Sequence, residues 1–513
     1  MPEEQDRYQL DEMMDRLHER TTSEHSGEGE LVTREDGSQV IRVRRRKRRS
    51  HQPEKERRRR IRIMQLTAAL LVLLVALLMV GFVTIYVNTE SYRKQLSAKL
   101  EATSGAQAKL IQFRMNPGAA NAQGLDLKWP QGSALDSLQL RLLSADITPV
   151  AVIAGKFHGN EMSIGTGKLS LGLPVEGESR RIVPVLDGDA PIRFKQYGVK
   201  RLQIEIDLQD AGIFRLNEVE ATLVPEKEGE SSLLRMTRGD LRAPDWPMFR
   251  LDRGYIKLGG GQAKVVGLGL LHPQDDAGKL EFSGILSPHD RLNPSLLEVS
   301  AESFLLSGLL GDSLGELFSG RVDSRKGSTA SQLEVGFGPD PMVDLDLNFQ
   351  VSKDDSLTLR HLPVLLALCE ILGDDWYAEP AFRGESSGIL IRAGNQIELR
   401  ELNLFSGERM AIRGRLGLHL GKLQGELRIG LPAAKITISE NRALDKMFGS
   451  PTDGYRWMDL SVSGTAARPM DSFVQAYDQA LTSLRAPAAG SARDRVDGDQ
   501  ANDRSFEELT KPR

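Results

Sequence analysis

Residues 343–351 read Val-Asp-Leu-Asp-Leu-Asn-Phe-Gln-Val, with an apolar side chain at every odd position and a polar one at every even position. Successive side chains of a β-strand point to opposite faces, so this period of two predicts a strand with one apolar and one polar face. The same alternation recurs in residues 202–208, 416–420 and 427–431. The chain therefore contains several strands that each need to cover one face.

Short turn signals separate these alternating runs. Asp187-Gly188-Asp189, Gly259-Gly260-Gly261 and Gly394-Asn395 are examples, and the chain has 49 glycines in all. Glycine reaches the positive φ angles that tight turns and bulges require. Many short strands joined in this way predict a mainly β protein with a meandering antiparallel sheet. Within this β-rich part, helices are expected at 304–318, 362–372 and 471–484, and another is expected just after the apolar segment described next.

Residues 63–87 contain no charged side chain and are almost wholly apolar. A helix of about 20 residues covers a hydrocarbon core roughly 30 Å thick, so this segment is long enough to cross a membrane. A signal peptide starts closer to the first residue and has a shorter apolar part. A buried core helix is the other alternative. We predict a single transmembrane helix.

A basic cluster directly precedes this segment and consists of Arg57, Arg58, Arg59, Arg60 and Arg62. Few cations follow the segment, and this asymmetry predicts a cytoplasmic N-terminus with export of the remaining chain. Next to an apolar span, such a cluster is expected to lie at the membrane surface and attract anionic lipid headgroups. A patch for nucleic acid or nuclear targeting is the alternative.

The composition limits the function of the exported part. The net charge of -4 includes the basic N-terminal segment, so the rest is mildly acidic and has no electrostatic reason to bind nucleic acid. The single cysteine, Cys369, excludes an intramolecular disulfide, and we expect it to be a buried thiol. No metal-binding or nucleotide-binding motif and no nucleophile motif is present. We therefore predict no cofactor, no metal and no enzymatic activity.

Segments at both ends of the exported part resemble the AsmA-like and TamB-like family. Residues 92–106 resemble the start of these proteins, where a membrane helix leads into an amphipathic segment that ends near a glycine. Residues 397–418 are similar to the family's C-terminal pattern of a strand that turns and returns. Residues 460–469 resemble its late Val-x-Gly-Thr-x-x-x-Pro strand. The middle of the chain, from about 130 to 330, carries no such resemblance.

The resemblance implies a protein of the bacterial inner membrane whose periplasmic part is an elongated, curved antiparallel β-sheet that forms a groove, with a few short helices. It implies binding of phospholipid or another acyl lipid, in phospholipid transport or outer-membrane biogenesis, with a possible protein partner in the envelope. The apolar side chains expected to contact lipid are Leu345, Leu347, Phe349, Leu399, Leu404, Ile412, Leu416, Leu418, Leu427 and Ile429.

A sheet with one apolar face has to cover that face, because large exposed apolar patches are rare in proteins. With few helices, the alternatives are a closed β-sandwich and a groove that holds acyl chains. A closed β-domain that acts as a scaffold of the cell envelope is thus the second hypothesis, and an enzyme with a polar cleft is a third.

The expected boundaries are 1–62 for a basic, disordered cytoplasmic tail, 63–87 for the transmembrane helix, 88–110 for the amphipathic helix, 111–330 for the first part of the β-rich groove, 331–485 for the AsmA-like C-terminal β region with its terminal helix, and 486–513 for a disordered tail.

Overall fold

The computed structural model describes residues 30–42, 52–116, 118–131, 133, 135–147, 157–172, 192–208, 212–226, 231–259, 262–288, 290, 292–325, 330–338 and 340–485. The chain divides into two compact units, residues 1–80 and residues 81–513. The C-terminal tail predicted at 486–513 and most of the predicted N-terminal tail lie outside the described residues.

The first unit contains a short hairpin and most of a long helix. Strands β1 (Glu30–Thr33) and β2 (Gln39–Arg42) pair antiparallel, and helix α2 runs over Gln52–Val87. Its segment Arg59–Val87 is long and apolar enough to cross a membrane, and its apolar side chains are exposed except near its end, where Val87 is buried. The helix begins before the predicted start at residue 63, because the preceding Glu, Lys and Arg residues favour helix.

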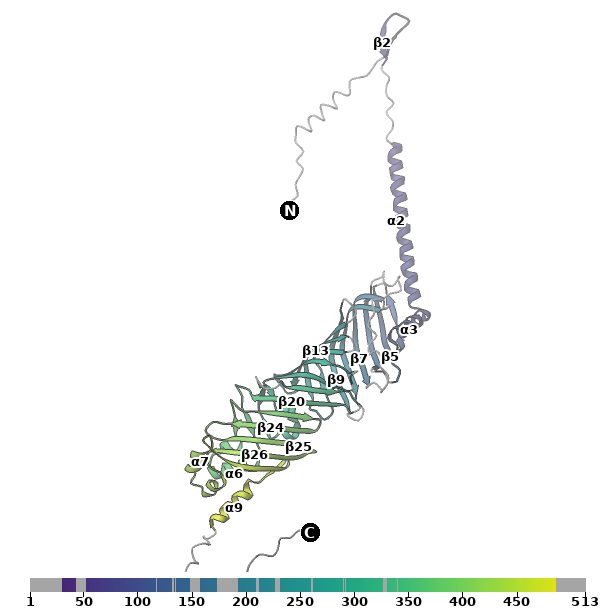
Figure 1. The fold of residues 1–513 in the computed structure, drawn as a ribbon. Coiled ribbons are helices and arrows are strands. Elements are labelled where there is room, and N and C mark those ends of the chain that lie inside the picture. The colour runs from purple at the N-terminus through teal and green to yellow at the C-terminus, as the bar shows by residue number, and fades with distance from the viewer. Residues whose placement is uncertain are drawn as a thin grey trace, which may run out of the picture. The chain divides into compact units, whose positions relative to one another are not determined.

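The second unit is dominated by one large curved sheet, and the predicted mainly β fold is confirmed (Figure 1). Its strands are β3 (Gln107–Ile111), β4 (Arg114–Asn116), β5 (Ala119–Lys128), β6 (Leu135–Ile147), β7 (Phe157–Gly172), β8 (Ile192–Asp207), β9 (Ile213–Pro225), β10 (Ser231–Thr237), β11 (Asp240–Arg242), β12 (Phe249–Gly259), β13 (Gln262–His272), β14 (Asp275–Leu286), β15 (Ser295–Glu302), β16 (Phe304–Leu305), β18 (Arg321–Ser324), β19 (Gln332–Gly336), β20 (Met342–Val351), β23 (Ser387–Ala393), β24 (Gln396–Phe405), β25 (Ala411–His419), β26 (Lys422–Pro432), β27 (Tyr455–Thr465) and β28 (Arg468–Asp471).

Strand pairing follows chain order almost throughout. β3 and β4 both pair with β5, and the order then runs through β6, β7, β8 and β9. β10 and β11 each pair with both β9 and β12, so these four strands form a closed ring of pairings. After β15, the short strands β18 and β19 both pair with β20, and the order continues to β28. Among the described strands, no recorded pair joins β28 to β3 or β4.

One pair departs from the predicted antiparallel arrangement. β7 and β8 run parallel, from the pair Phe157–Ile192 to the pair Gly172–Asp207, so the sheet is mixed. A parallel pair needs a crossover connection longer than a hairpin turn. Period-two patterning is the same in parallel and antiparallel strands, and the sequence pattern therefore could not distinguish them.

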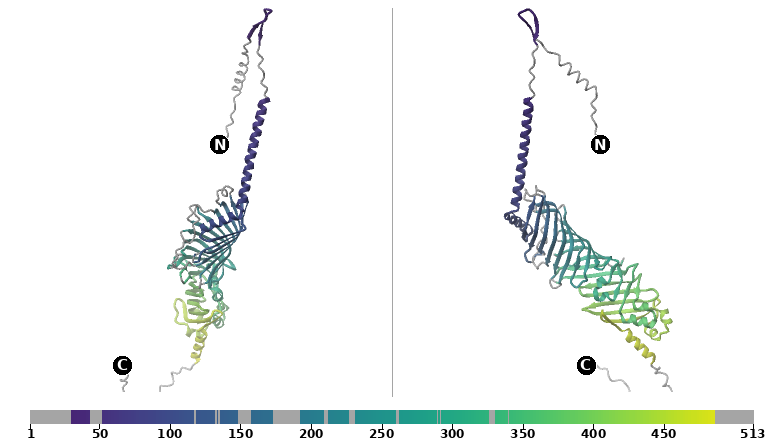
Figure 2. Two further views of the ribbon diagram at one scale, coloured as in Figure 1. Left: turned by 90° about the vertical axis from the view of Figure 1, so that its right-hand side faces the viewer. Right: turned by 180° about the vertical axis from the view of Figure 1, so that it is seen from behind.

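Helices of the second unit lie mainly near the two ends of the sheet (Figures 1 and 2). They are α3 (Glu90–Ser104), α5 (Ser307–Gly315), α6 (Pro363–Leu372), the 3₁₀ turn η2 (Asp375–Ala378), α7 (Ala433–Ile438), α8 (Arg442–Met447) and α9 (Phe473–Arg485). Strands β17 (Phe318–Ser319), β21 (Leu357–Leu359) and β22 (Ala381–Phe382) form a separate small sheet.

The predicted helices are present with shifted ends. α6 and α9 lie within one or two residues of prediction, and α3 ends where Gly105 takes a left-handed φ of 67°. The helix predicted at 304–318 is shortened to α5, because short strands occupy both of its ends. Gly311, with φ 70° and ψ 178°, also breaks the helix internally.

Candidate functional site

The side chains predicted to contact lipid lie together on one face of β20, β24, β25 and β26, which we call the inner face. Neighbouring strands place Leu399 opposite Leu416, and Ile412 lies opposite both Leu404 and Ile429. All the predicted side chains belong to one apolar cluster, with exposed fractions between 0% for Leu347 and 8% for Leu418. The sequence pattern thus identified one continuous face.

This part of the inner face is covered by the protein itself. Helices α5 and α6 contribute Leu309, Leu310 and Leu365 to the same cluster, and α7 and α8 contribute Ile436 and Leu444. Each of these side chains is almost completely buried. Lipid contact by the predicted side chains stays a prediction, and in this structure they form a packed core.

Further towards the N-terminus, strands β8 to β13 carry both buried inner-face side chains, such as Leu202, Val219 and Met236, and partly exposed ones. A row of apolar side chains packs against the edge of the large cluster yet remains partly exposed; it comprises Val199, Ile204, Leu216, Leu234, Ile256 and Leu268, and we call it the inner row. The register joins Ile204 to Leu216 and Leu234 to Ile256, so the row crosses neighbouring strands. The alternation in residues 202–208 signalled Ile204, but no local pattern connects the other members of the row.

At the N-terminal end of the sheet, α3 covers the inner face above strands β3 to β8. Leu96 and Leu100 of α3 line an apolar cavity of about 60 Å³ together with Phe113, Ala122 and Phe194. Asn88, just after α2, donates its side-chain N–H to the Met115 carbonyl at 2.9 Å and accepts the Met115 amide at 2.8 Å. The last turn of α2 and the start of α3 are thereby fixed to β4.

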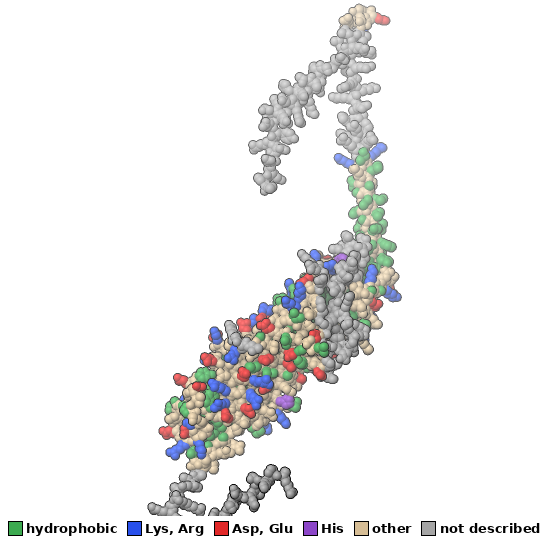
Figure 3. Space-filling model, in the orientation of Figure 1, with side chains coloured by type: hydrophobic (Ala, Val, Ile, Leu, Met, Phe, Trp, Pro, Cys, Tyr) green, Lys and Arg blue, Asp and Glu red, His purple; other side chains and the backbone are tan. Residues whose placement is uncertain are grey.

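Charged side chains of both signs alternate over the face of the second unit seen in Figure 3. Many of them pair across exposed strand surfaces, for example Arg253 with Glu281 at 2.6 Å and Arg415 with Glu426 at 2.9 Å. Exposed pairs of this kind contribute little stability. This mixture gives the face seen there no single charge that would attract a polyanion.

Asp275 and Arg321 form a more protected ion pair between β14 and β18. The Arg321 guanidinium meets the two Asp275 oxygens at 2.7 and 2.9 Å, and the carboxylate side chain is only 11% exposed. The hydrogen bond from Arg321 lowers the pKa of Asp275 below its ordinary value of 3.8. The two residues are 46 positions apart in the sequence, so only the tertiary packing brings them together.

Asp275→Asn is expected to lower the free energy of unfolding by about 2 kcal/mol at pH 7, since it removes the closer of the two carboxylates that face the Arg321 guanidinium and leaves only Asp355, at 3.6 Å. The folded pKa lies below the unfolded one, so the pair stabilises above the unfolded pKa and this contribution is lost as the pH falls through the folded pKa. Thermal melts of the full chain in detergent at pH 7 and pH 3 measure both effects. Asp276→Asn, at a side chain 77% exposed, is the matched control and should change little.

Arg392 of β23 is a buried cation on the inner face. Its side chain donates to the backbone carbonyls of Leu309 in α5 and Asp245 in the β11–β12 loop. The guanidinium carbon lies 4.9 Å from the centre of the Trp246 ring, and only 3% of the residue is exposed. Burial lowers the pKa of Arg392 to about 10, so the side chain stays protonated at neutral pH.

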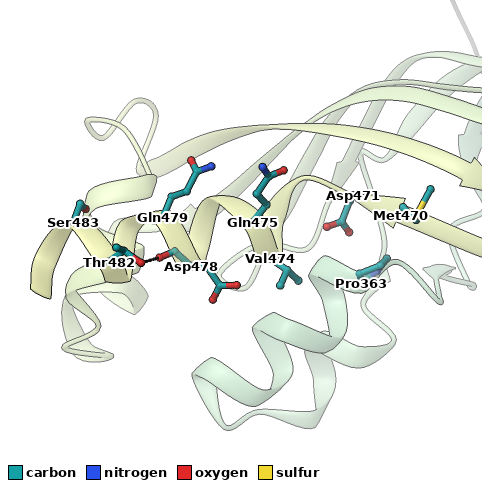
Figure 4. A pocket seen from close by; sticks show the side chains of 9 residues that line it. All are labelled: Pro363, Met470, Asp471, Val474, Gln475, Asp478, Gln479, Thr482 and Ser483. Atoms are coloured by element: carbon teal, nitrogen blue, oxygen red, sulfur yellow. Dashed lines mark hydrogen bonds between the residues drawn. The ribbon is translucent and has the colours of Figure 1, made fainter. Parts of the chain in front are cut away.

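A shallow pocket of about 830 Å³ lies beside α9, at the other end of the sheet (Figure 4). Pro363, Met470 and Val474 form its apolar part, and Asp478 and Gln479 are among its polar side chains. Asp471 accepts the amides of Val364 at 2.7 Å and Phe473 at 3.0 Å, and so caps the first turns of α6 and α9. Its carboxylate therefore has a structural role at this pocket.

Groupings typical of catalysis are scarce in the part of the chain that the structure describes. Among these residues, no group of three or more His, Cys, Asp or Glu side chains is placed to hold a metal ion. Cys369 is half-buried, in place of the expected full burial, and its Sγ lies 3.8 Å from an Asp375 oxygen. Desolvation and the nearby Asp375 raise the pKa of this thiol, which disfavours the nucleophilic thiolate.

Comparisons with known proteins provide no further guide to this site. No family model, curated protein or solved structure matches the chain significantly. The resemblance to AsmA-like proteins therefore stays a prediction.

Proposed function

We propose that this chain is a membrane-anchored lipid-binding protein that holds acyl chains along the inner row. The partial exposure of apolar side chains such as Ile204, Leu234 and Ile256 on a concave sheet is the observation that carries the proposal. Covering apolar surface stabilises by roughly 25 cal/mol per Å², so an acyl chain lying on this row gains affinity without any polar contact. Five neighbouring strands, β8, β9, β10, β12 and β13, contribute to the row, which extends on the order of 20 Å across the sheet.

The same proposal includes a location. Arg59, Arg60 and Arg62 are exposed on α2 directly before its apolar segment, and this charge asymmetry supports a cytoplasmic N-terminus with the sheet on the periplasmic side of a bacterial inner membrane. The side chains of Arg57 and Arg58 lie outside the described residues. A role in phospholipid transport or outer-membrane biogenesis, with an envelope protein as partner, follows from the AsmA-like resemblance.

A scaffold without lipid is the second candidate function. The complete burial of Leu347, Leu404 and Leu416 beneath helices favours it, since that part of the inner face leaves no room for cargo. The two functions make opposite predictions for the inner row, where lipid binding requires space and a scaffold does not.

Charged substitution in the inner row tests the proposal. The double variant Ile204→Asp/Leu234→Asp is expected to retain about tenfold less lipid than the wild type, because carboxylates in contact with acyl chains are strongly penalised. Native mass spectrometry and lipid extraction of the full chain in detergent measure the bound lipid. The positions are partly exposed, so the fold should persist, with a melting temperature close to that of the wild type.

The matched control places the same charges on the opposite face. Val266 and Ile285 are 56% and 46% exposed, and the variant Val266→Asp/Ile285→Asp should retain wild-type lipid. Lipid bound around α2 contributes equally to all three proteins and cancels in the comparison. Equal lipid in the wild type and the inner-row variant would favour the scaffold.

A further inference from the structure

The inner face is interrupted where α5 lies on it. Leu309, Leu310 and Leu314 of α5 are at most 1% exposed, and they join the cluster that contains Leu347 and Leu390. Gly308 is in such close contact that a Cβ atom there would lie 2.7 Å from the His272 ring. The helix therefore fills the concave side at the boundary between the inner row and the packed C-terminal core.

Arg392 holds this helix at its break. In a regular helix the Leu309 carbonyl would accept an amide four residues later, but the backbone at Gly311 is not helical. The Arg392 side chain donates to that carbonyl from β23. It also donates to the carbonyl of Asp245, which is 147 positions away in the sequence.

The β11–β12 loop completes the contact with Arg392. Trp246 of this loop stacks with the Arg392 guanidinium and lies 6.3 Å from Phe249, whose ring lies 6.4 Å from Phe304 just before α5. Burying a guanidinium is costly unless its charge is compensated. Backbone carbonyls and an aromatic ring hold this cation, and the nearby Asp245 charge favours its protonated form, while its Nε has no hydrogen-bond partner among the described residues.

We propose that α5, which Arg392 clamps to β23 and to the β11–β12 loop, is a barrier that ends the lipid-accessible part of the inner face. This inference rests on the proposed lipid binding and specifies where it stops. Lipid reaches the inner row between α3 and α5 and does not pass along the sheet to the C-terminal core. The chain then acts as a holder of limited capacity, and lipid has to leave sideways from the row.

Site-specific photo-crosslinking in the full chain tests whether α5 is such a barrier to lipid. The photoreactive residue p-benzoylphenylalanine is placed at Leu234 in the inner row or at Met458, which is also partly exposed and packs on the inner face beyond α5. Tyr255, 41% exposed, provides a background position. The protein is reconstituted in vesicles of phosphatidylethanolamine and phosphatidylglycerol, irradiated and analysed for lipid adducts by mass spectrometry.

Lipid adducts at Leu234 with only background at Met458 are expected. Comparable adducts at both positions would overturn the proposal that α5 is a barrier and would leave the proposed lipid binding intact. Background levels at both positions would overturn the proposed lipid binding and, with it, the proposal that α5 is a barrier. These results do not depend on any variant of the clamp, so a folding defect cannot obscure them.

Hydrogen exchange tests the clamp itself. Arg392→Met removes the donors at similar side-chain volume, and the amides of residues 309–315 are expected to exchange about tenfold faster than in the wild type. Arg400→Met, on the neighbouring strand, removes an exposed arginine paired with Glu398 and should leave this exchange unchanged. Identical exchange in the Arg392 variant and the wild type would show that Arg392 does not hold α5.

Discussion

Leu347→Asp is expected to unfold the second unit, and not merely to remove lipid from it. Leu347 is 0% exposed and lies opposite Leu390 in the large apolar cluster. Burying a carboxylate there costs more than about 5 kcal/mol, which is comparable with the whole stability of a typical domain. Far-UV circular dichroism and protease resistance of the full chain in detergent should both reveal the loss of structure.

The control for this prediction is the same substitution on an exposed leucine. Leu296 of β15 is 54% exposed, so Leu296→Asp should leave the melting temperature within a few degrees of the wild type. A folded, protease-resistant Leu347→Asp protein would mean that the C-terminal core opens readily, and the open-groove interpretation of this region would then be restored.

Gly414→Ala is expected to lower the free energy of unfolding by about 3 kcal/mol or more. Gly414 has a φ of 137°, and a Cβ atom would lie 2.1 Å from the Glu426 carbonyl oxygen on β26. It lies at a bulge in the pairing of β24 and β25, where the register shifts between Leu399 and Leu402. Backbone strain and the clash with a paired strand add together here.

Gly417→Ala on the same strand is the matched control. The nearest atom to a Cβ at this position is 3.4 Å away, and its φ is not in the left-handed region. Denaturant unfolding of both variants in detergent measures the difference. Equal stability of the two proteins would indicate that β25 can shift relative to β26 and that the bulge is not fixed.

The structure separates two parts of the inner face that the sequence presents alike. Residues 343–351 and residues 202–208 show the same alternation, yet Leu347 is fully buried and Ile204 is partly exposed. Side chains of α5 to α8 belong to the apolar cluster that buries Leu347, whereas Ile204 packs against that cluster and stays partly exposed, between the buried Leu202 and Leu208. The best position for testing lipid binding therefore moves from the predicted C-terminal side chains to the inner row.

The sequence by itself determined the features that depend on local patterns. Period-two alternation gave the strands and the face on which Leu399 and Leu416 lie, and the uncharged run gave the candidate span within α2. The glycine near which the amphipathic segment was expected to end, Gly105, closes α3 in a left-handed conformation, which favours glycine.

Only the tertiary structure decided which segments meet. It placed β7 parallel to β8, paired Asp275 with Arg321, and brought Arg392 to Leu309 and Asp245 over separations of 83 and 147 residues. Local periodicity reports which face of a strand is apolar, but not what covers that face. Packing between distant segments decides that, and here it buries the side chains around Leu347 and leaves those of the inner row partly exposed.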